Sequence, residues 1–409
     1  MIDPLVVARA VHIAATAITV GAILFGVAII RPVLGRQTTA VEHYLTNLAR
    51  LIWCTLIVAI VSGLLWAMLL AAQIDDASIG DVLRTGTFTD LLTETRFGQV
   101  WILRALLAAI VVLTLRSAHG FLPLTAAAAM LAALAWASHS GARSDAIGWF
   151  QVSADMAHLL AAGAWLGSLP ALALLLGSQV PASTCAAATR RFSTIGVVAV
   201  VILLLTGAAN TYLLTDSIAA LTETRYGQLV LLKIALFTAM LVLAAINRWH
   251  WTPKLPERRA IGAIRRHSLI EAGLGLCAVA IVGILGTLPP PLHRHVHASD
   301  ASPEAAFVHI HDINGMAEVT ILPGRAGPSE VWIRLMREDF TPMTAQNVLV
   351  RLSQFGQQSV TAEARSGATG LWRAPDIVLP TSGVWTAMIE IRTGSGSPLV
   401  LDGPIVIAP

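Results

Sequence analysis

Charged residues are scarce in this chain. Asp, Glu, Lys and Arg make up 12% of its 409 residues, whereas a soluble domain carries about 25%. The shortage is uneven, because long apolar runs fill residues 1–290 and a more polar segment with many Gly, Pro, Ser and Thr residues follows. The composition excludes a wholly soluble protein and predicts a membrane part followed by a soluble tail.

Cysteine is also rare. Cys54, Cys185 and Cys277 all precede residue 290, so the tail is expected to form no internal disulfide. The tail therefore needs a hydrophobic core of its own, and any soft or borderline metal ligands within it would be His and Met.

Motifs typical of enzymes and nucleic-acid binders are missing. The sequence has no phosphate-binding glycine loop, no supported Ser-His-Asp set and no zinc-protease motif, so we expect no enzymatic activity. The formal net charge is +3, and the basic residues lie mostly between apolar runs, where they set membrane topology. This distribution does not indicate nucleic-acid binding.

Apolar runs of membrane-crossing length are abundant. A spanning helix needs about 20 residues, and only helices satisfy their own backbone groups within one segment in lipid. We predict eight spans, near residues 5–30, 48–72, 98–116, 121–138, 152–177, 192–214, 228–247 and 267–288. Lys and Arg are concentrated after spans one, three, five and seven, which places those loops inside and both the N-terminus and the tail outside.

Two polar octapeptides indicate an internal repeat. "LTETRFGQ" at 92–99 and "LTETRYGQ" at 221–228 each precede a predicted span, and their Thr residues are expected to cap it. Three further features agree: residues 62–70 resemble 206–214, residues 11–21 resemble 157–167, and Arg104 and Lys233 share a repeat position. We therefore predict two parallel four-helix repeats, related by an axis along the membrane normal.

The tail shows the alternation typical of strands. Segments such as "AEVTILP", "NVLVRLS" and "GVWTAMIEIR" contribute to about seven short strands with Gly and Pro turns, which predicts a small β-sandwich. The predicted fold is a polytopic α-helical membrane protein with a C-terminal β-sandwich. The expected parts are a transmembrane domain at 1–290, a His-rich linker at 291–304 and the sandwich at 305–409.

Ionisable side chains in the predicted spans are candidates for function because they are costly in a membrane. His12 and His158 occupy equivalent repeat positions, about one and a half to two turns below the outer face. His139 ends span four at the same face, Asp155 shares a helix face with His158, and Met156 is a neighbouring soft ligand. Because imidazole suits Cu, Zn, Fe and Ni, these residues predict a metal or haem site.

Other interpretations of the membrane residues remain open. A lone intramembrane histidine can bond a neighbouring helix, which is favoured for His12 taken alone, and two facing histidines can hold a haem iron. Arg104 and Lys233 either snorkel outward or pair with acidic groups. Glu271 lies close in sequence to the arginines at 265–266, which favours a structural salt bridge.

The tail and its linker are also rich in histidine. "HRHVH" places His293, His295 and His297 just after the last span, where they form either a metal-binding tract or a polar spacer. His309 and His311 lie two apart on a predicted strand and therefore share one face, which suits chelation of one metal ion.

Several segments together resemble the copper-resistance protein D (CopD) family. They are "DMAHLLAAGAWLGSLPAL" at 155–172, "GQLVLLKIALFTAMLVLAAINRW" at 227–249 and "RRHSLIEAGLGLCAVAIVGILGTLPP", which contains Glu271. In the tail, "ILPGRAGPSEVWIRLM" and "GVWTAMIEI" are similar to the YtkA-like β-sandwich that is often fused to CopD modules.

The resemblance implies copper handling at the bacterial inner membrane, with uptake from the periplasm, copper as the bound ion and a periplasmic copper chaperone as a candidate partner. CopC-type carriers bind copper through an N-terminal histidine, which is unavailable in an internal tail, so this tail would use internal His and Met. Two alternatives remain. One is a haem- or quinone-linked redox protein that uses His12 and His158, and the other is a copper sensor or assembly factor that transports nothing.

Overall fold

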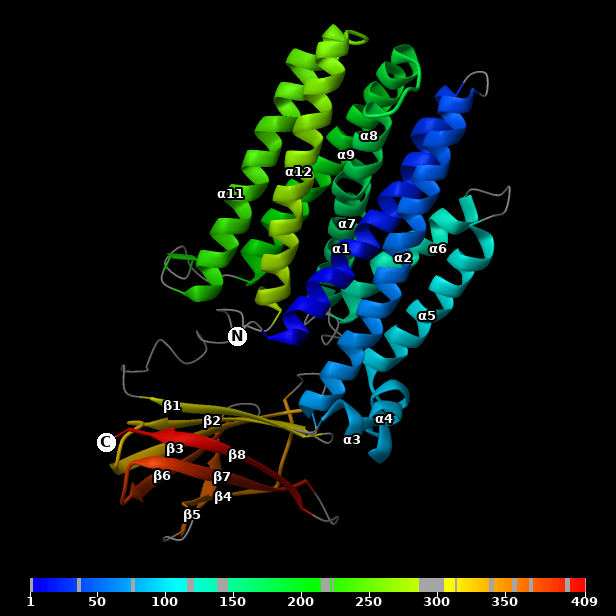
Figure 1. The fold of residues 1–409 in the computed structure, drawn as a ribbon. Coiled ribbons are helices and arrows are strands. Elements are labelled where there is room, and N and C mark those ends of the chain that lie inside the picture. The colour runs from blue at the N-terminus through cyan, green and yellow to red at the C-terminus, as the bar shows by residue number, and fades with distance from the viewer. Residues whose placement is uncertain are drawn as a thin grey trace. The chain divides into compact units, whose positions relative to one another are not determined.

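The computed structural model describes residues 3–34, 38–74, 78–115, 121–137, 146–214, 221–222, 224–286, 305–312, 315–337, 342–354, 359–367, 371–393 and 398–408. These residues fall into two compact units, one of helices and one of β-strands (Figure 1). The predicted linker at 291–304 lies outside the described residues.

The helical unit consists mostly of long apolar helices. They are α1 (Pro4–Leu24), α2 (Thr39–Ile74), α5 (Arg96–Thr114), α6 (Phe121–Ala132), α7 (Ala146–Trp165), α8 (Leu169–Leu176), α9 (Ala182–Leu214), α11 (Arg225–Ile246) and α12 (Arg258–Leu285). Short segments extend several of them: η1 (Phe25–Ile30), η2 (Arg31–Val33), η3 (Ala133–Ala137), η5 (Leu166–Ser168), η6 (Asn247–Trp251) and η7 (Thr252–Lys254).

Seven helical segments are long and apolar enough to cross a membrane, and Phe121–Trp136 is a shorter apolar helix at the position of predicted span four. Large apolar side chains such as Leu106, Leu113 and Leu205 remain exposed on these helices. Such a surface suits contact with lipid, so the predicted multi-pass membrane fold is confirmed.

The two octapeptides begin their helices in the same way. Thr95 Oγ1 accepts a hydrogen bond from the Gly98 amide at 3.0 Å, and Thr224 Oγ1 accepts one from the Gly227 amide at 2.9 Å. The backbone angles of the two N-caps also agree, with φ/ψ of −106°/150° and −99°/147°. The octapeptide is therefore a duplicated capping corner, as predicted.

Helix packing follows the same duplication. In the first half α1 packs on α2 and α5 on α6, and in the second half α7 packs on α9 and α11 on α12 (Figure 1). These are equivalent pairs in the predicted four-helix repeat.

The two halves meet at matched glycines. A Cβ atom added at Gly167 would lie 2.0 Å from the Ala17 carbonyl oxygen, and one at Gly21 would lie 2.1 Å from the Gly167 carbonyl carbon. Ser168 Oγ also donates to the Gly21 carbonyl at 2.9 Å. Gly21 and Gly167 are aligned in the repeat, so their mutual contact is what a two-fold relation between the halves requires. Span five changes at this point from α7 through η5 into α8, where Pro170 lies in the first turn.

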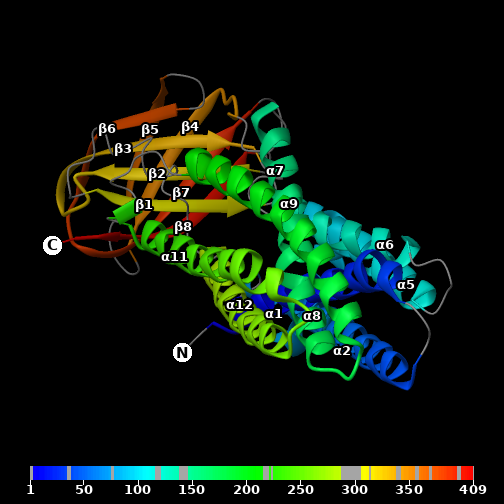
Figure 2. The same ribbon diagram turned by 90° about the horizontal axis from the view of Figure 1, so that it is seen from above.

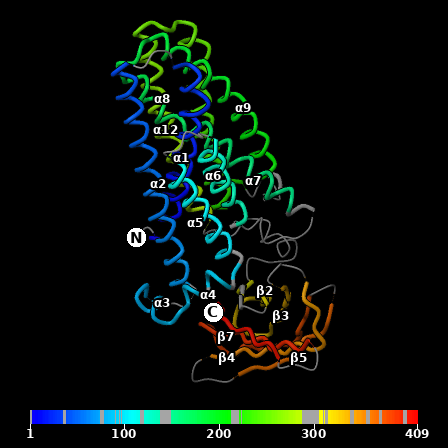
Figure 3. The backbone as a smooth tube through the Cα atoms, turned by 90° about the vertical axis from the view of Figure 1, so that its right-hand side faces the viewer, coloured from blue at the N-terminus to red at the C-terminus, as the bar shows by residue number. Residues whose placement is uncertain are grey.

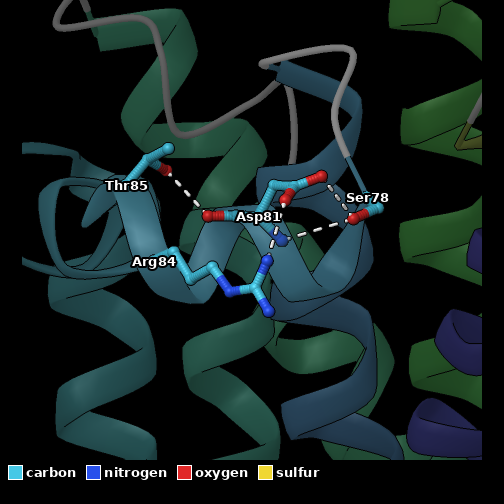
Figure 4. Close-up of polar contacts among 4 residues, drawn as sticks. All are labelled: Ser78, Asp81, Arg84 and Thr85. Carbon is cyan, nitrogen blue, oxygen red and sulfur yellow. Dashed lines mark hydrogen bonds and ion pairs between the residues drawn. The ribbon is translucent and has the colours of Figure 1, made fainter.

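Two short helices follow α2, α3 (Ile79–Thr85) and α4 (Thr87–Glu94) (Figure 3). Ser78 caps α3 by accepting from the Asp81 amide, and its hydroxyl donates to the Asp81 carboxylate at 2.6 Å (Figure 4). Arg84 lies 3.8 Å from the same carboxylate. Gly86 separates the two helices in the left-handed region, with φ of 87°. The loop expected between spans two and three is thus partly helical.

The β unit contains eight strands. They are β1 (Ala306–Asp312), β2 (Gly315–Leu322), β3 (Gly327–Met336), β4 (Asn347–Ser353), β5 (Ser359–Ser366), β6 (Leu371–Leu379), β7 (Gly383–Arg392) and β8 (Leu399–Ile407). Sequence patterning missed β5, because its alternating apolar residues are small and only Ala364 among them is fully buried.

The strands form one antiparallel sheet in the order β1-β2-β3-β6-β5-β4-β7-β8. Only two residue pairs join β5 to β6, so the sheet folds there into two four-stranded halves over one core. β1 and β8 are also in contact, which nearly closes the sheet (Figure 2). The core includes Trp385 and Ile333, which are 1% and 0% exposed. The predicted small β-domain is confirmed.

Candidate metal site in the helical unit

His12 is enclosed within the first repeat and has both ring nitrogens occupied. Its Nδ1 lies 2.7 Å from the Ala59 carbonyl oxygen on α2, and its Nε2 contacts the Arg104 guanidinium on α5. A guanidinium can only donate, so Nε2 accepts and Nδ1 carries the proton given to Ala59. Arg104 also donates to the Met130 carbonyl on α6, so one arginine links α1, α5 and α6.

Aromatic rings and cations surround His12. The Trp66 and Trp101 rings lie 5.8 and 4.9 Å from the imidazole, measured between ring centroids. Arg9 lies over Trp66 and Arg104 over Trp101, each 5.0 Å from the ring centroid. Among the described residues, the Nε atoms of both arginines and the Nε1 atoms of both tryptophans have no hydrogen-bond partner. The cluster is rich in donors and positive charge, so it is poorly suited to a metal cation.

His158 occupies the equivalent position in the second repeat but has a different bonding pattern. Its Nδ1 lies 2.9 Å from Thr206 Oγ1, and that hydroxyl donates its own proton to the Ile202 carbonyl at 2.6 Å. Nδ1 must therefore be the donor to Thr206, which leaves the Nε2 lone pair as an acceptor or metal ligand. No hydrogen bond to Nε2 exists within the described part of the chain.

A carboxylate accompanies His158. Asp155, one turn earlier on α7, accepts a hydrogen bond from Asn210 Nδ2 on α9 at 2.6 Å. Lys233 on α11 interacts electrostatically with both Asp155 and His158, and Tyr226 lies within the field of the same carboxylate. Side chains from α7, α9 and α11 thus place an imidazole, a carboxylate, an amide and an ammonium group near one another.

The repeat alignment pairs these clusters position by position and shows a reversal of charge. Arg9 precedes His12 by three residues, as Asp155 precedes His158, and Trp66 aligns with Asn210. The same pair of positions therefore holds a cation–π contact in the first repeat and an amide–carboxylate hydrogen bond in the second. Sequence reasoning missed Arg9, Thr206 and Asn210, although each lies within or beside the aligned segments.

Among the described residues, the predicted ligands do not form a cluster. Every polar contact of His12 and His158 among the described residues lies within its own repeat. No group of three or more His, Cys, Asp or Glu residues with metal-binding spacing occurs in the described ranges. Met156 lies half-buried on α7 beside Asp155. His139, His293, His295 and His297 lie outside the described residues.

The two tail histidines lie on β1, as the sequence predicts. The His309 backbone pairs with Glu318 and the His311 backbone with Met316, both on β2. Their side chains are outside the described part of the structure.

Glu271 differs from its expected role. It is 2% exposed on α12 and accepts a hydrogen bond from Asn247 Nδ2 at 2.9 Å. Asn247 Oδ1 in turn lies 2.8 Å from His267 Nδ1. No ion pair joins Glu271 to an arginine among the described residues, so the expected salt bridge with the arginines at 265–266 is replaced by a neutral amide contact.

Two family descriptions match this chain. Residues 1–149 match the family described as copper resistance protein D-like, N-terminal domain, and residues 186–285 match the family described as copper resistance protein D. The first match covers the first repeat, and the second begins within α9 and ends with α12, so it omits α7 and α8.

Three curated proteins are similar over long stretches. The copper transport protein CutJ of Bacillus subtilis (strain 168) is 27% identical over 77% of this chain, which spans 59% of CutJ. Copper resistance protein D of Pseudomonas syringae pv. tomato is 29% identical over 49% of this chain and 71% of its own length. The inner membrane protein YebZ of Escherichia coli (strain K12) is 30% identical over 48% of this chain and 70% of its own length.

Proposed function

Because the chain belongs to the copper resistance protein D family, we propose that it carries copper across the bacterial inner membrane, with uptake from the periplasm as the direction. The helical unit would lie in the lipid bilayer, with the N-terminus and the β unit on the periplasmic side. The basic residues after spans one, three, five and seven support this orientation.

The difference between His12 and His158 carries the proposal. A copper ligand needs a free lone pair and a field that tolerates a cation. His158 offers Nε2 one helical turn from the Asp155 carboxylate, which offsets the positive charge of Lys233, whereas His12 Nε2 is occupied by Arg104 and Arg9 lies nearby over Trp66. We therefore assign copper binding to the second repeat and a structural role to its counterpart in the first.

The number of ligands suits transfer of copper rather than storage. His158 and Asp155 are the proposed His and carboxylate ligands at this position, with Met156 adjacent in sequence as a proposed soft ligand. A transport site must bind an ion well enough to take it up and weakly enough to release it. Two or three ligands meet that requirement better than a closed four-ligand cage.

The β unit would receive copper first. His309 and His311 on β1, the linker histidines 293, 295 and 297 and His139 are further proposed ligands on the outer side. A periplasmic copper chaperone would deliver the ion to these residues.

Matched substitutions at the two repeat-equivalent histidines test the proposal. Gln keeps a donor for Thr206 or Ala59 but removes the imidazole, so His158→Gln should abolish copper accumulation in proteoliposomes while the protein stays folded. His12→Gln should lower thermal stability and leave copper transport per folded molecule unchanged. Asp155→Asn should weaken copper binding by about 10–100-fold, as expected for a group that orients a ligand.

Three results would contradict the proposal. If His158→Gln accumulates copper like the wild type, the membrane site lies elsewhere, and the Met and Cys residues become the next candidates. Copper binding without any flux in the wild type would favour a sensor or assembly factor. A haem absorbance band lost in His158→Gln would favour the redox alternative, although the contact of His12 Nε2 with Arg104 disfavours a two-histidine haem.

A further inference from the structure

A second polar site lies in the same repeat as His158. A partly open cavity of about 40 Å³ is lined by residues of α7, α8, α9, α11, η6 and α12, and its polar lining consists of Thr189, Asn247, Ser268 and Glu271. A buried water needs about 10–15 Å³ on this measure, so the cavity has room for about three. The remaining lining is apolar, including Trp165.

Glu271 is the ionisable group of this cavity. Asn247 Nδ2 donates to its carboxyl at 2.9 Å, and His267 Nδ1 lies 2.8 Å from Asn247 Oδ1. An amide oxygen can only accept, so His267 donates and the two hydrogen bonds point in one direction, from His267 to Glu271. His267 is partly exposed and Glu271 is buried, so the chain of contacts leads inward from the surface of the unit.

The nearby basic side chains are committed elsewhere. Arg190 on α9 donates to the Leu255 carbonyl at 3.4 Å, and Arg191 donates to the Ala28 carbonyl at 3.3 Å. On η6, Arg248 donates to Ser193 Oγ at 2.8 Å.

Charged groups on the other packed elements also have contacts elsewhere, and Arg266 on α12 interacts electrostatically with His267. Lys254 on η7 contacts His250, Arg265 lies against Gly177, and Arg9 on α1 lies against Gly286. Within the described ranges, Glu271 has a neutral donor and no ion-paired cation. An ionised carboxylate in this position is costly, so the group should carry a proton or exchange it for a cation.

The cavity lies along the helices that hold the proposed copper site. Trp165 follows His158 by seven residues on α7, about 10 Å along the axis and on the same helix face. Asn247 follows Lys233 by 14 residues on α11 and η6, about 21 Å along the axis. The second repeat therefore contains two polar sites at different depths.

We propose that Glu271 is a proton-binding site, which carries one proton in this cavity and exchanges it with the side of the membrane where His267 lies. Release breaks the carboxyl O–H bond and passes the proton to solvent, and uptake reverses this step. We further propose that this exchange is coupled to copper movement through the same repeat. The coupling rests on the proposed copper transport, whereas the proton site does not.

Infrared difference spectroscopy tests the proton site without copper. The full chain in lipid vesicles is titrated across about pH 4–10, where carboxyl groups and histidines change charge. The wild type should show a carboxyl C=O band typical of an apolar environment, and Glu271→Gln should lose it. Glu257→Gln, which changes an exposed carboxylate just before α12, should retain the band. A band that persists in folded Glu271→Gln, or is absent from the wild type throughout, overturns the proton site.

A flux measurement tests the coupling. Copper entry into proteoliposomes is recorded with and without an imposed pH gradient, using copper ions alone as the probe. Wild type and Glu257→Gln should respond to the gradient, and Glu271→Gln should lose the response. If the wild type carries copper with no response, the coupling is wrong although the proton site can stand. If the wild type carries no copper at all, the proposed function fails and the coupling fails with it, whatever the infrared result.

Discussion

Gly21 and Gly167 determine how closely the two repeats approach. At both positions the backbone of the other half lies where a Cβ atom would have to be, within 2.0–2.1 Å. Neither glycine has a positive φ, so space and not backbone conformation requires the missing side chain. The contact fixes the position of α7 against α1, and α7 carries His158 and Asp155.

Substitution of Gly167 should therefore damage the fold. Gly167→Ala forces the helices apart, and overpacking of this kind costs about 1–3 kcal/mol. Gly273→Ala on α12 is the matched control, because nothing lies within 4 Å of its Cβ position, and removal of a helix-interior glycine should stabilise by up to about 1 kcal/mol. Thermal unfolding in detergent should show a lower midpoint for Gly167→Ala alone. Equal midpoints in the two variants would contradict the close-approach argument.

The charge difference between Arg9 and Asp155 has a consequence for selectivity. Both residues lie one turn before a histidine in equivalent helices, and both contact the α2 or α9 partner of that helix. The two repeats thus share one scaffold, and the residue one turn before the histidine is cationic in the first repeat and acidic in the second. Under the proposed function, Arg9 and Arg104 disfavour a cation at the first site, whereas Asp155 offsets Lys233 so that the second site can accept one.

At the scale of elements, the octapeptide explains why two long helices start where they do. The first four amides of a helix have no partner within it, and Thr95 and Thr224 each satisfy one of them. The starts of α5 and α11 then determine the depth of Arg104 and Lys233, which lie eight residues further along each helix. The positions of both clusters therefore depend on this polar segment.

Loss of a cap should loosen one helix start. Thr95→Ala and Thr224→Ala should each cost about 1 kcal/mol, and hydrogen exchange should rise in the first turn of α5 or α11. Thr93→Ala is the control within the octapeptide, since its hydroxyl donates to the Thr89 carbonyl within the preceding helix and caps nothing. If the Gly98 and Gly227 amides are protected from exchange equally in the cap variants and in Thr93→Ala, the caps do not stabilise these helices.

At the scale of the whole molecule, the proposed route for copper requires both termini on the outer side. Reporter fusions check this orientation directly. A fusion after Pro409 should report the periplasm, and one near Pro256, between η7 and α12, should report the cytoplasm, because the basic loops are retained inside. The opposite pattern would reverse the position of every proposed site, including the side with which Glu271 exchanges protons.

The sequence alone determined the architecture, because membrane spans and strands are specified by local composition. Apolar runs located seven long spans and the shorter helix at Phe121–Trp136, and the repeated octapeptide identified both capping corners. Alternation located seven of the eight strands, and β5 was missed because it buries little. The alignment also singled out His12 and His158 as equivalents.

Only the tertiary structure decided what those equivalents do. Which lone pair is free depends on side chains distant in sequence: Arg104 reaches His12 across 92 positions, Thr206 reaches His158 across 48, and Asn210 reaches Asp155 across 55. Glu271 likewise contacts Asn247 and a cavity, although arginines are closer to it in the sequence. Composition and periodicity report local preferences. Hydrogen-bond partners and cavities arise from packing between helices, and this packing gives the two equivalent histidines different partners.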